Sequence, residues 1–128
     1  MQTKLTEEQI KLIKENEWII LSTANQNHQP HCIIVIPSRV ESERIILSNI
    51  QMQTTIKNLE ENNKCCINIY CAKESDTQIK IHGKATIQKE GTLYEEIKND
   101  EETNNLPENL KVNAIIIVEI ENIKVSKE

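Results

Sequence analysis

The sequence lacks the features of several protein classes. No apolar run approaches the roughly 20 residues that a membrane-spanning helix needs, so we expect no membrane partner. The N-terminal residues 1–17 are polar and amphipathic, without the apolar segment of a secretory signal. Because reduced thiols are typical of the cytoplasm, the four cysteines of such a chain favour a cytoplasmic location.

Aromatic residues are scarce, and positive charge is not in excess. The chain has no Phe, one Trp and two Tyr, and its 15 basic residues are outnumbered by 20 acidic ones. Nucleic-acid-binding domains typically carry a basic stripe with interleaved aromatics, and none is visible here. We therefore expect no nucleic-acid partner. A pocket for a single phosphate group is compatible with this composition, because it does not depend on net charge.

Several catalytic and metal-binding motifs are missing. The sequence contains no G-x-S-x-G, Walker or zincin pattern, so acyl transfer, P-loop chemistry and zinc proteolysis lack support. It has no C-x-x-C pair, and the adjacent Cys65 and Cys66 point to opposite faces of a predicted strand, so we expect no metal site. His28, His31 and His82 are expected to be exposed polar residues.

What the sequence does contain is a pattern of short, Ile-rich strands. Its 128 residues suit one domain, to which we assign residues 1–128. Isoleucine is β-branched and favours strands, while a capping box formed by Thr6 and Gln9 predicts a helix over residues 6–16. The predicted strands are residues 18–24, 30–36, 44–49, 65–72, 77–88 and 112–125, with a helical segment over 54–62 and a helical or irregular segment over 91–109.

Short connections between these strands predict antiparallel pairing, and closure into a barrel would remove exposed sheet edges. The fold class we expect is therefore mainly β with short helices. Three strands, which contain WIIL, CIIVI and AIIIVEI, are apolar on both faces. A barrel interior covers one face only, so the second apolar face predicts a homodimer interface.

Three ordered segments resemble a known family. Residues 21–24 (LSTA) followed by 29–31 (QPH) are similar to its opening hairpin. Residues 46–49 (ILSN), 54–59 (TTIKNL) and 61–64 (ENNK) are similar to its strand–turn–helix unit, and 81–85 (IHGKA) to a later strand. Together they cover most of the chain and resemble the FMN-binding split-barrel family, whose members are pyridoxamine 5'-phosphate oxidase-like.

The resemblance implies an antiparallel, Greek-key-like split β-barrel that forms a homodimer and binds FMN at the subunit interface. Two sets of residues follow from it. Those implied to hold the FMN phosphate are Thr54, Thr55 and Lys57. Those implied to line the edge of the flavin ring are Ser48, Asn49, Ile50 and Gln51.

The residues themselves agree with this assignment. A helix beginning at Thr54 and Thr55 offers unpaired N–H groups and a favourable dipole to an anion, and Lys57 adds a charge one turn later. Two departures from the family pattern matter. The second strand carries no Arg or Lys, and the chain ends without the Arg-rich, aromatic segment of true pyridoxamine-phosphate oxidases. We therefore do not predict vitamin B6 synthesis.

The function that follows is a flavoprotein, with FMN supplying the redox chemistry of a small oxidoreductase. Its small-molecule substrate would be a nicotinamide cofactor, a quinone or a nitroaromatic compound, and no catalytic side chain stands out. The alternatives are a non-catalytic protein that binds a flavin, a deazaflavin or haem, and a dimeric scaffold without a cofactor. The sequence leaves open whether residues 91–109 close over the site.

Overall fold

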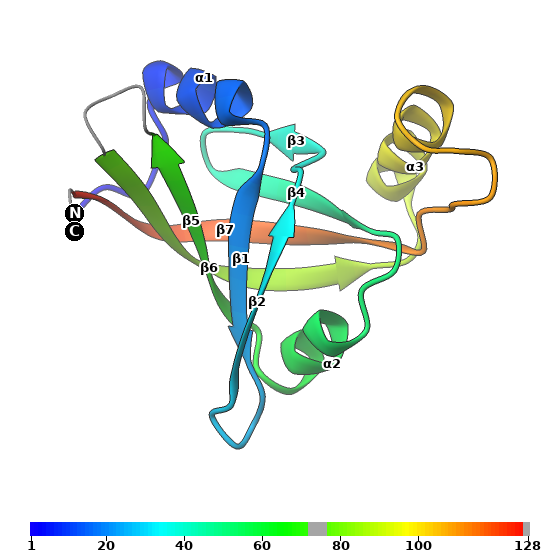
Figure 1. The fold of residues 1–128 in the computed structure, drawn as a ribbon, viewed down its shortest axis with the longest axis horizontal. Helices are drawn as coiled ribbons and strands as arrows, with labels where there is room; N and C mark the ends of the chain where they lie inside the picture. The colour runs from blue at the N-terminus through cyan, green and yellow to red at the C-terminus, as the bar shows by residue number, and fades with distance from the viewer. Residues whose placement is uncertain (72–76, 127–128) are drawn as a thin grey trace.

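The chain folds around one curled antiparallel sheet (Figure 1). The computed structural model describes residues 1–71 and 77–126. Its elements are α1 (Glu7–Asn16), β1 (Ile19–Ala24), β2 (Pro30–Val35), β3 (Arg39–Val40), β4 (Arg44–Asn49), α2 (Thr54–Glu61), β5 (Lys64–Cys71), β6 (Thr77–Gln88), α3 (Thr92–Asn104) and β7 (Ala114–Ser126). The described strands form a seven-stranded sheet in the order β2-β1-β5-β6-β7-β4-β3, with every neighbouring pair antiparallel.

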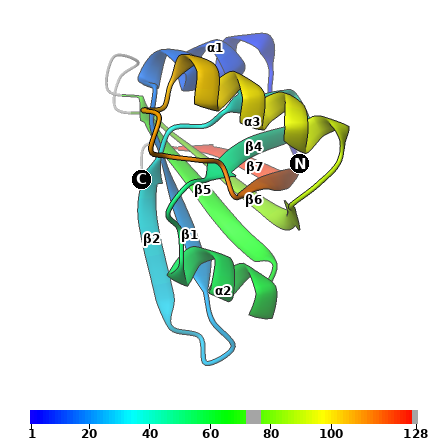
Figure 2. The same ribbon diagram turned by 90° about the vertical axis from the view of Figure 1, so that its right-hand side faces the viewer.

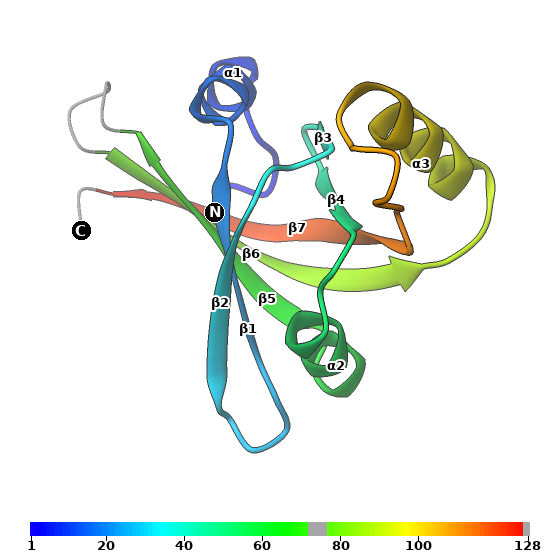
Figure 3. The same cartoon turned by 45° about the vertical axis from the view of Figure 1, so that its right-hand side comes forward.

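The sheet is a split barrel. Its two edge strands, β2 and β3, share no ladder within the described residues, so the curl stays open between them (Figures 1 and 3). The neighbours β1–β5 and β4–β7 are far apart in sequence, which gives a Greek-key-like order. The expected fold class, mainly β with short helices in a split antiparallel barrel, is confirmed. The homodimer is a separate expectation that one chain does not test.

Local sequence signals set the first helix and the first hairpin. The backbone N–H of Gln9 donates to the Thr6 side chain, and the Gln9 side chain accepts from the Thr6 N–H, so the predicted capping box forms at the start of α1. The β1–β2 turn is closed by Asn25, whose side chain accepts hydrogen bonds from the N–H groups of Asn27 and Gln29. Within this turn, His28 takes the left-handed conformation, with φ of 64°.

The structure corrects three predicted boundaries. The two-residue strand β3 lies within a segment read as a turn, because Arg39 and Val40 pair with β4 over too short a stretch to form a pattern. Residues 91–109 resolve into α3 and a following loop. The last strand starts at Ala114 instead of at residue 112, because the backbone N–H and carbonyl of Val112 bond to side chains of α3. The predicted end of the fourth strand, Ala72, lies outside the described residues.

The core has two parts, one on each side of the strands β4 and β7. The barrel interior contains Leu47, Ile116 and Val118 among many buried residues. On the other face of the same strands, Ile46 and Ile115 are buried beneath α3 in a second cluster with Tyr94, Ile97, Val112 and Ile117. The second apolar face of β7 is thus covered by the chain's own helix, so its burial does not require a partner chain. Among the described helices, none is long and apolar enough to cross a membrane.

Candidate functional site

A cavity of about 970 Å³ lies between β2, the end of β4, the start of α2 and the end of α3. This volume is at the upper end of the range typical of small-molecule and cofactor sites. Figure 2 shows α3 above and α2 below, with the segment that follows β4 running between them. The described residues that line the cavity are His31, Ile33, Ile34, Val35, Ile36, Pro37, Ser38, Ser48, Ile50, Gln51, Met52, Gln53, Thr54, Thr55, Asp100, Glu101, Asn105 and Leu106.

The end of β4 forms one wall. Ser48 is buried and lines the cavity, with its Oγ 2.6 Å from Oγ of Ser38. Asn49 is also buried, but it supports the wall from behind: its Oδ1 accepts the N–H of Met52 at 2.8 Å. Ile50 and Gln51 follow and line the cavity. Three of the four residues expected along the flavin ring therefore reach the cavity, and Asn49 does not.

The start of α2 forms a second wall. The helix begins at Thr54, as predicted, and no side chain caps its N-terminal N–H groups. Thr54 is exposed, Thr55 is buried, and both line the cavity. Lys57 is exposed and is not among the lining residues. Thus two of the three residues expected at the phosphate meet the cavity, where the uncapped helix end provides a site that favours an anion.

Formal charge on the cavity walls is negative. Asp100 and Glu101 line it from the last turns of α3, and each accepts a hydrogen bond from an Asn one turn later, Asn104 and Asn105 respectively, both at 2.9 Å. Among the described lining residues there is no Lys or Arg. An anionic ligand in a single chain would therefore rely on the N-terminus of α2 for its favourable electrostatics.

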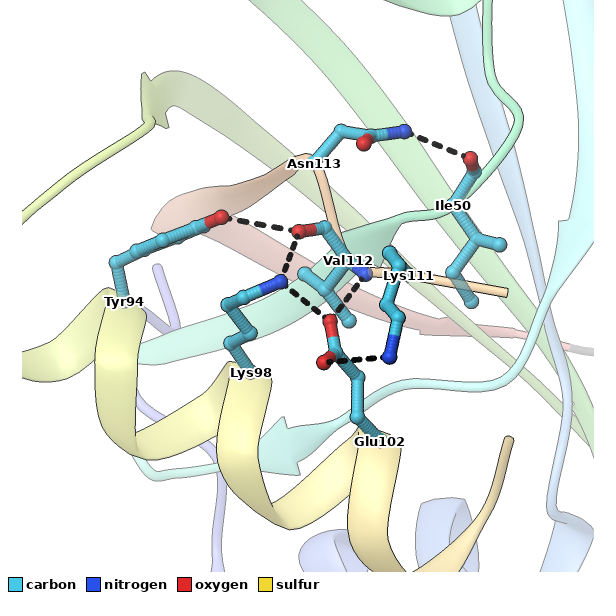
Figure 4. Close-up of polar contacts among 7 residues, drawn as sticks. All are labelled: Ile50, Tyr94, Lys98, Glu102, Lys111, Val112 and Asn113. Carbon is cyan, nitrogen blue, oxygen red and sulfur yellow. Dashed lines mark hydrogen bonds and ion pairs between the residues drawn. The ribbon is translucent and has the colours of Figure 1, made fainter. Parts of the chain in front are cut away.

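Behind the α3 wall, three side chains hold the backbone N–H and carbonyl of one buried residue, Val112 (Figure 4). Oε2 of Glu102 accepts the N–H of Val112 at 2.8 Å and also pairs with Nζ of Lys98. The Val112 carbonyl accepts from Oη of Tyr94 at 2.9 Å and from Lys98 at 3.2 Å. The bond to Lys98 and the Val112 N–H lower the pKa of Glu102, and the bond to Glu102 raises the pKa of Lys98.

The next residue, Asn113, joins Val112 to the β4 wall. Its backbone N–H donates to the carbonyl of Asn49 at 2.8 Å, and its side-chain amide donates to the carbonyl of Ile50 at 2.9 Å (Figure 4). Asn113 thereby extends the β4–β7 pairing past its last pair, Asn49 with Ala114. The direction in which the cavity wall leaves β4 is set by this residue.

Sequence reasoning missed the contributions of β2 and α3. Ile33 to Pro37 were read as an ordinary strand and turn, yet alternate sides of this edge strand reach the cavity. The α3 residues lie some 50 positions after β4 in the sequence, and their pattern is that of a solvated helix. A usable signal was the resemblance itself, because members of that family often carry a phosphate-binding Arg or Lys in the second strand, which corresponds to β2. His31, expected to be exposed, is half-buried and lines the cavity.

The cysteines lie away from this cavity. None of them lines it, and Cys32, Cys65 and Cys66 are free thiols. Burial raises the pKa of Cys65 to about 12, with smaller contributions from Cys66 and Glu121, and burial also raises the pKa of Cys66. In the described part of the chain, no three His, Cys, Asp or Glu side chains are grouped so that they could hold a metal ion.

Comparison with known proteins identifies the family. A HupZ protein of Group A Streptococcus has the same fold, with a TM-score of 0.83 at 22% identity over 97% of this chain and 95% of that one. An FMN-binding protein from Syntrophomonas wolfei gives 0.74 at 20% identity over 90% and 81%. An F420 reductase gives 0.71 at 16% identity over 97% and 100%. No curated protein matches the sequence. Residues 5–125 match the family described as pyridoxamine 5'-phosphate oxidase, and the chain belongs to that family.

Proposed function

We propose that this protein binds FMN in the cavity, with the phosphate at the N-terminus of α2. The observation that carries the proposal is the uncapped first turn of an eight-residue helix at the wall of a cofactor-sized cavity. Free N–H groups and the helix dipole favour an anion there. The hydroxyls of Thr54 and Thr55 add neutral donors, and the exposed Lys57 lies one turn further along. The family, and the FMN-binding protein from Syntrophomonas wolfei that shares the fold, support the choice of FMN.

The flavin ring would lie along Ser48, Ile50 and Gln51. The backbone and hydroxyl groups of this wall supply donors and acceptors for the polar edge of the ring, while Ile33, Met52 and other apolar side chains pack against its faces. Bound FMN would supply the electron-transfer chemistry of a small oxidoreductase. The chain's own part is to bind and orient the ring and to limit access of water. The small-molecule substrate would be a nicotinamide, a quinone or a nitroaromatic compound.

We infer that the working form is a homodimer. Ile34 and Ile36 are each 69% exposed although both line the cavity, so the site is open to solvent along β2. Exposed apolar side chains on an edge strand and directly after it are typical of a surface that another protein covers. A second copy on β2 would close the cavity. It would also bring further groups to a site whose described lining has carboxylates but no Lys or Arg.

The test is a titration of the purified protein with FMN and with riboflavin, which lacks the phosphate. We expect FMN to bind at least about tenfold more tightly, because charge-assisted hydrogen bonds contribute about 1.5–3 kcal/mol each. Thr54→Glu would place a carboxylate at the first position of α2, where it suits the helix but repels the phosphate. Thr92→Glu is the matched control, since it makes the same change at the exposed first residue of α3.

The proposal requires that Thr54→Glu weaken FMN binding and leave riboflavin binding unchanged, with no effect of Thr92→Glu. Equal affinities for FMN and riboflavin, unaffected by Thr54→Glu, would remove the phosphate assignment. Absence of FMN binding at excess ligand would remove the flavin assignment, and a deazaflavin, haem or a cofactor-free dimeric scaffold would then be the candidates. Turnover with a reduced nicotinamide separates an oxidoreductase from a flavin-binding protein without catalysis.

A further inference from the structure

We propose that Tyr94, Lys98 and Glu102 of α3 are positioning residues for the FMN-binding wall after β4, and that they act through the backbone of Val112 and through Asn113. This inference rests on the proposed function, because it assigns FMN to that wall. None of these residues belongs to the described lining of the cavity. Their influence on a ligand must therefore pass through the backbone that they hold (Figure 4).

The backbone groups of Val112 are bonded by side chains of α3. This residue is 1% exposed and precedes the first paired residue of β7, so the sheet does not bond its peptide groups. Buried N–H and carbonyl groups must find partners elsewhere. Glu102 takes the N–H, and Tyr94 and Lys98 share the carbonyl. Both groups of the residue are thus held by side chains from three successive turns of α3.

Asn113 connects Val112 to the cavity wall. Asn113 follows directly in the chain, and it bonds the carbonyls of Asn49 and Ile50, the points where the wall leaves β4. Asn49 in turn accepts the N–H of Met52, which fixes the bend that leads to α2. A shift of the Val112 backbone therefore displaces Asn113 and breaks its side-chain hydrogen bond to the carbonyl of Ile50.

The helix α3 also forms part of the cavity itself. Asp100, Glu101 and Leu106 line it from the end of the same helix and the loop that follows. A ligand that touches both walls depends on their separation, and the contacts at Val112 set that separation. Because coupling between sites is reciprocal, bound FMN should also stabilise α3 against local opening.

The experiment compares Glu102→Ala, Glu102→Gln and the matched control Glu95→Ala, which removes an exposed carboxylate from the same helix. FMN affinity is measured by titration, and backbone hydrogen exchange is followed at Met52 and Asn113. We expect Glu102→Ala to weaken FMN binding at least about fivefold, the lower end of typical coupling between sites. Glu102→Gln should recover part of the affinity, because its amide oxygen still accepts the Val112 N–H. Glu95→Ala should bind as the wild type does.

A folded Glu102→Ala protein with wild-type FMN affinity and unchanged exchange at Met52 and Asn113 overturns the proposal. So does an equal loss in both Glu102 variants that follows their melting temperature alone. If Glu102→Ala does not fold, Tyr94→Phe, which removes one of two bonds to the Val112 carbonyl, decides the same question. If the wild type binds no FMN, the proposed function fails, and faster exchange at Met52 and Asn113 in Glu102→Ala still supports the positioning role, while unchanged exchange overturns it.

Discussion

The side-chain amide of Asn58 in α2 donates a hydrogen bond to the hydroxyl of Thr23 in β1, 3.1 Å away, and both residues are buried. The two are 35 positions apart in the sequence. This contact ties the helix that begins at the cavity to β1, the strand next to the edge strand β2. It fixes the direction in which the N-terminus of α2 points.

Asn58→Ala should lower the free energy of unfolding by about 1–3 kcal/mol, because it leaves a buried hydroxyl without its partner and removes packed atoms. Urea unfolding measures this change. Asn99→Ala, at an exposed position of α3, should have little effect. A Thr23→Val, Asn58→Ala double variant that loses as much as the two single variants summed would contradict the direct coupling.

Gly83→Ala should destabilise the sheet. A Cβ atom at this position would lie 2.6 Å from Cγ1 of Val118 and 2.7 Å from the carbonyl oxygen of Glu119, at the bulge where β6 and β7 change register. Backbone on that side cannot rotate away, so overpacking should cost about 1–3 kcal/mol in unfolding free energy. Thr86→Ala on the exposed side of β6 is the control, and an equal effect of both substitutions in urea unfolding would refute the steric account.

Ile34→Glu should convert a dimer into a monomer. The side chain is 69% exposed on the edge strand β2, so the substitution should leave the fold of one chain intact while placing a charge in the interface. Size-exclusion chromatography with light scattering gives the mass. Val125→Glu changes another exposed apolar residue, on β7, and should leave the mass unchanged. A wild-type protein that is monomeric at all concentrations would contradict the interface.

The thiols should react in an order set by burial. Cys32 is exposed on β2 and should be modified first by a thiol reagent at pH 8. Cys65 should be resistant, since burial raises its pKa to about 12 and leaves almost no thiolate. Mass spectrometry of the labelled sites tests the order. If β2 forms the dimer interface, Cys32 should also react faster in Ile34→Glu than in the wild type, and equal rates would count against that interface.

The Lys98–Glu102 pair should contribute to the pH dependence of stability. The pKa of Glu102 is lowered in the folded chain, so its contribution is present above the ordinary value of 4.5 and is lost as the pH falls through the folded value. The pKa of Lys98 is raised, so its contribution is present below the ordinary value of 10.5 and is lost as the pH rises through the folded value.

Melting temperatures measured between pH 3 and pH 7 should therefore fall less steeply for Glu102→Gln than for the wild type, as about one linked proton is removed. The two curves should approach each other at the acid end. Glu95→Gln should follow the wild-type curve. Parallel curves for Glu102→Gln and the wild type would show that the carboxylate of Glu102 is not the linked group.

The amino-acid sequence was enough to predict the longer strands, the two cavity walls closest to its motifs and the family, but not the two-residue strand β3. Ile-rich segments of alternating polarity predicted strands, and the capping residues Thr6 and Gln9 predicted the start of α1 because they interact locally. The order of the segments similar to the family indicated that β4 and α2 would hold the ligand. Ser48, Ile50, Gln51, Thr54 and Thr55 accordingly line the cavity. These features depend on neighbours within a few positions, so local hydrogen bonds and side-chain periodicity can be inferred from the sequence.

Which element covers each apolar strand face became clear from the three-dimensional packing alone. The second face of β7 is buried under α3, whereas that of β2 is open, and the residue patterns of the two strands do not distinguish the cases. The same holds for Asp100, Glu101 and Asn113, whose neighbours in space lie about 50–65 positions away in the sequence. Whether a helix packs against a sheet depends on how well the shapes of the two surfaces fit together, and the residue pattern of one strand does not reveal this fit.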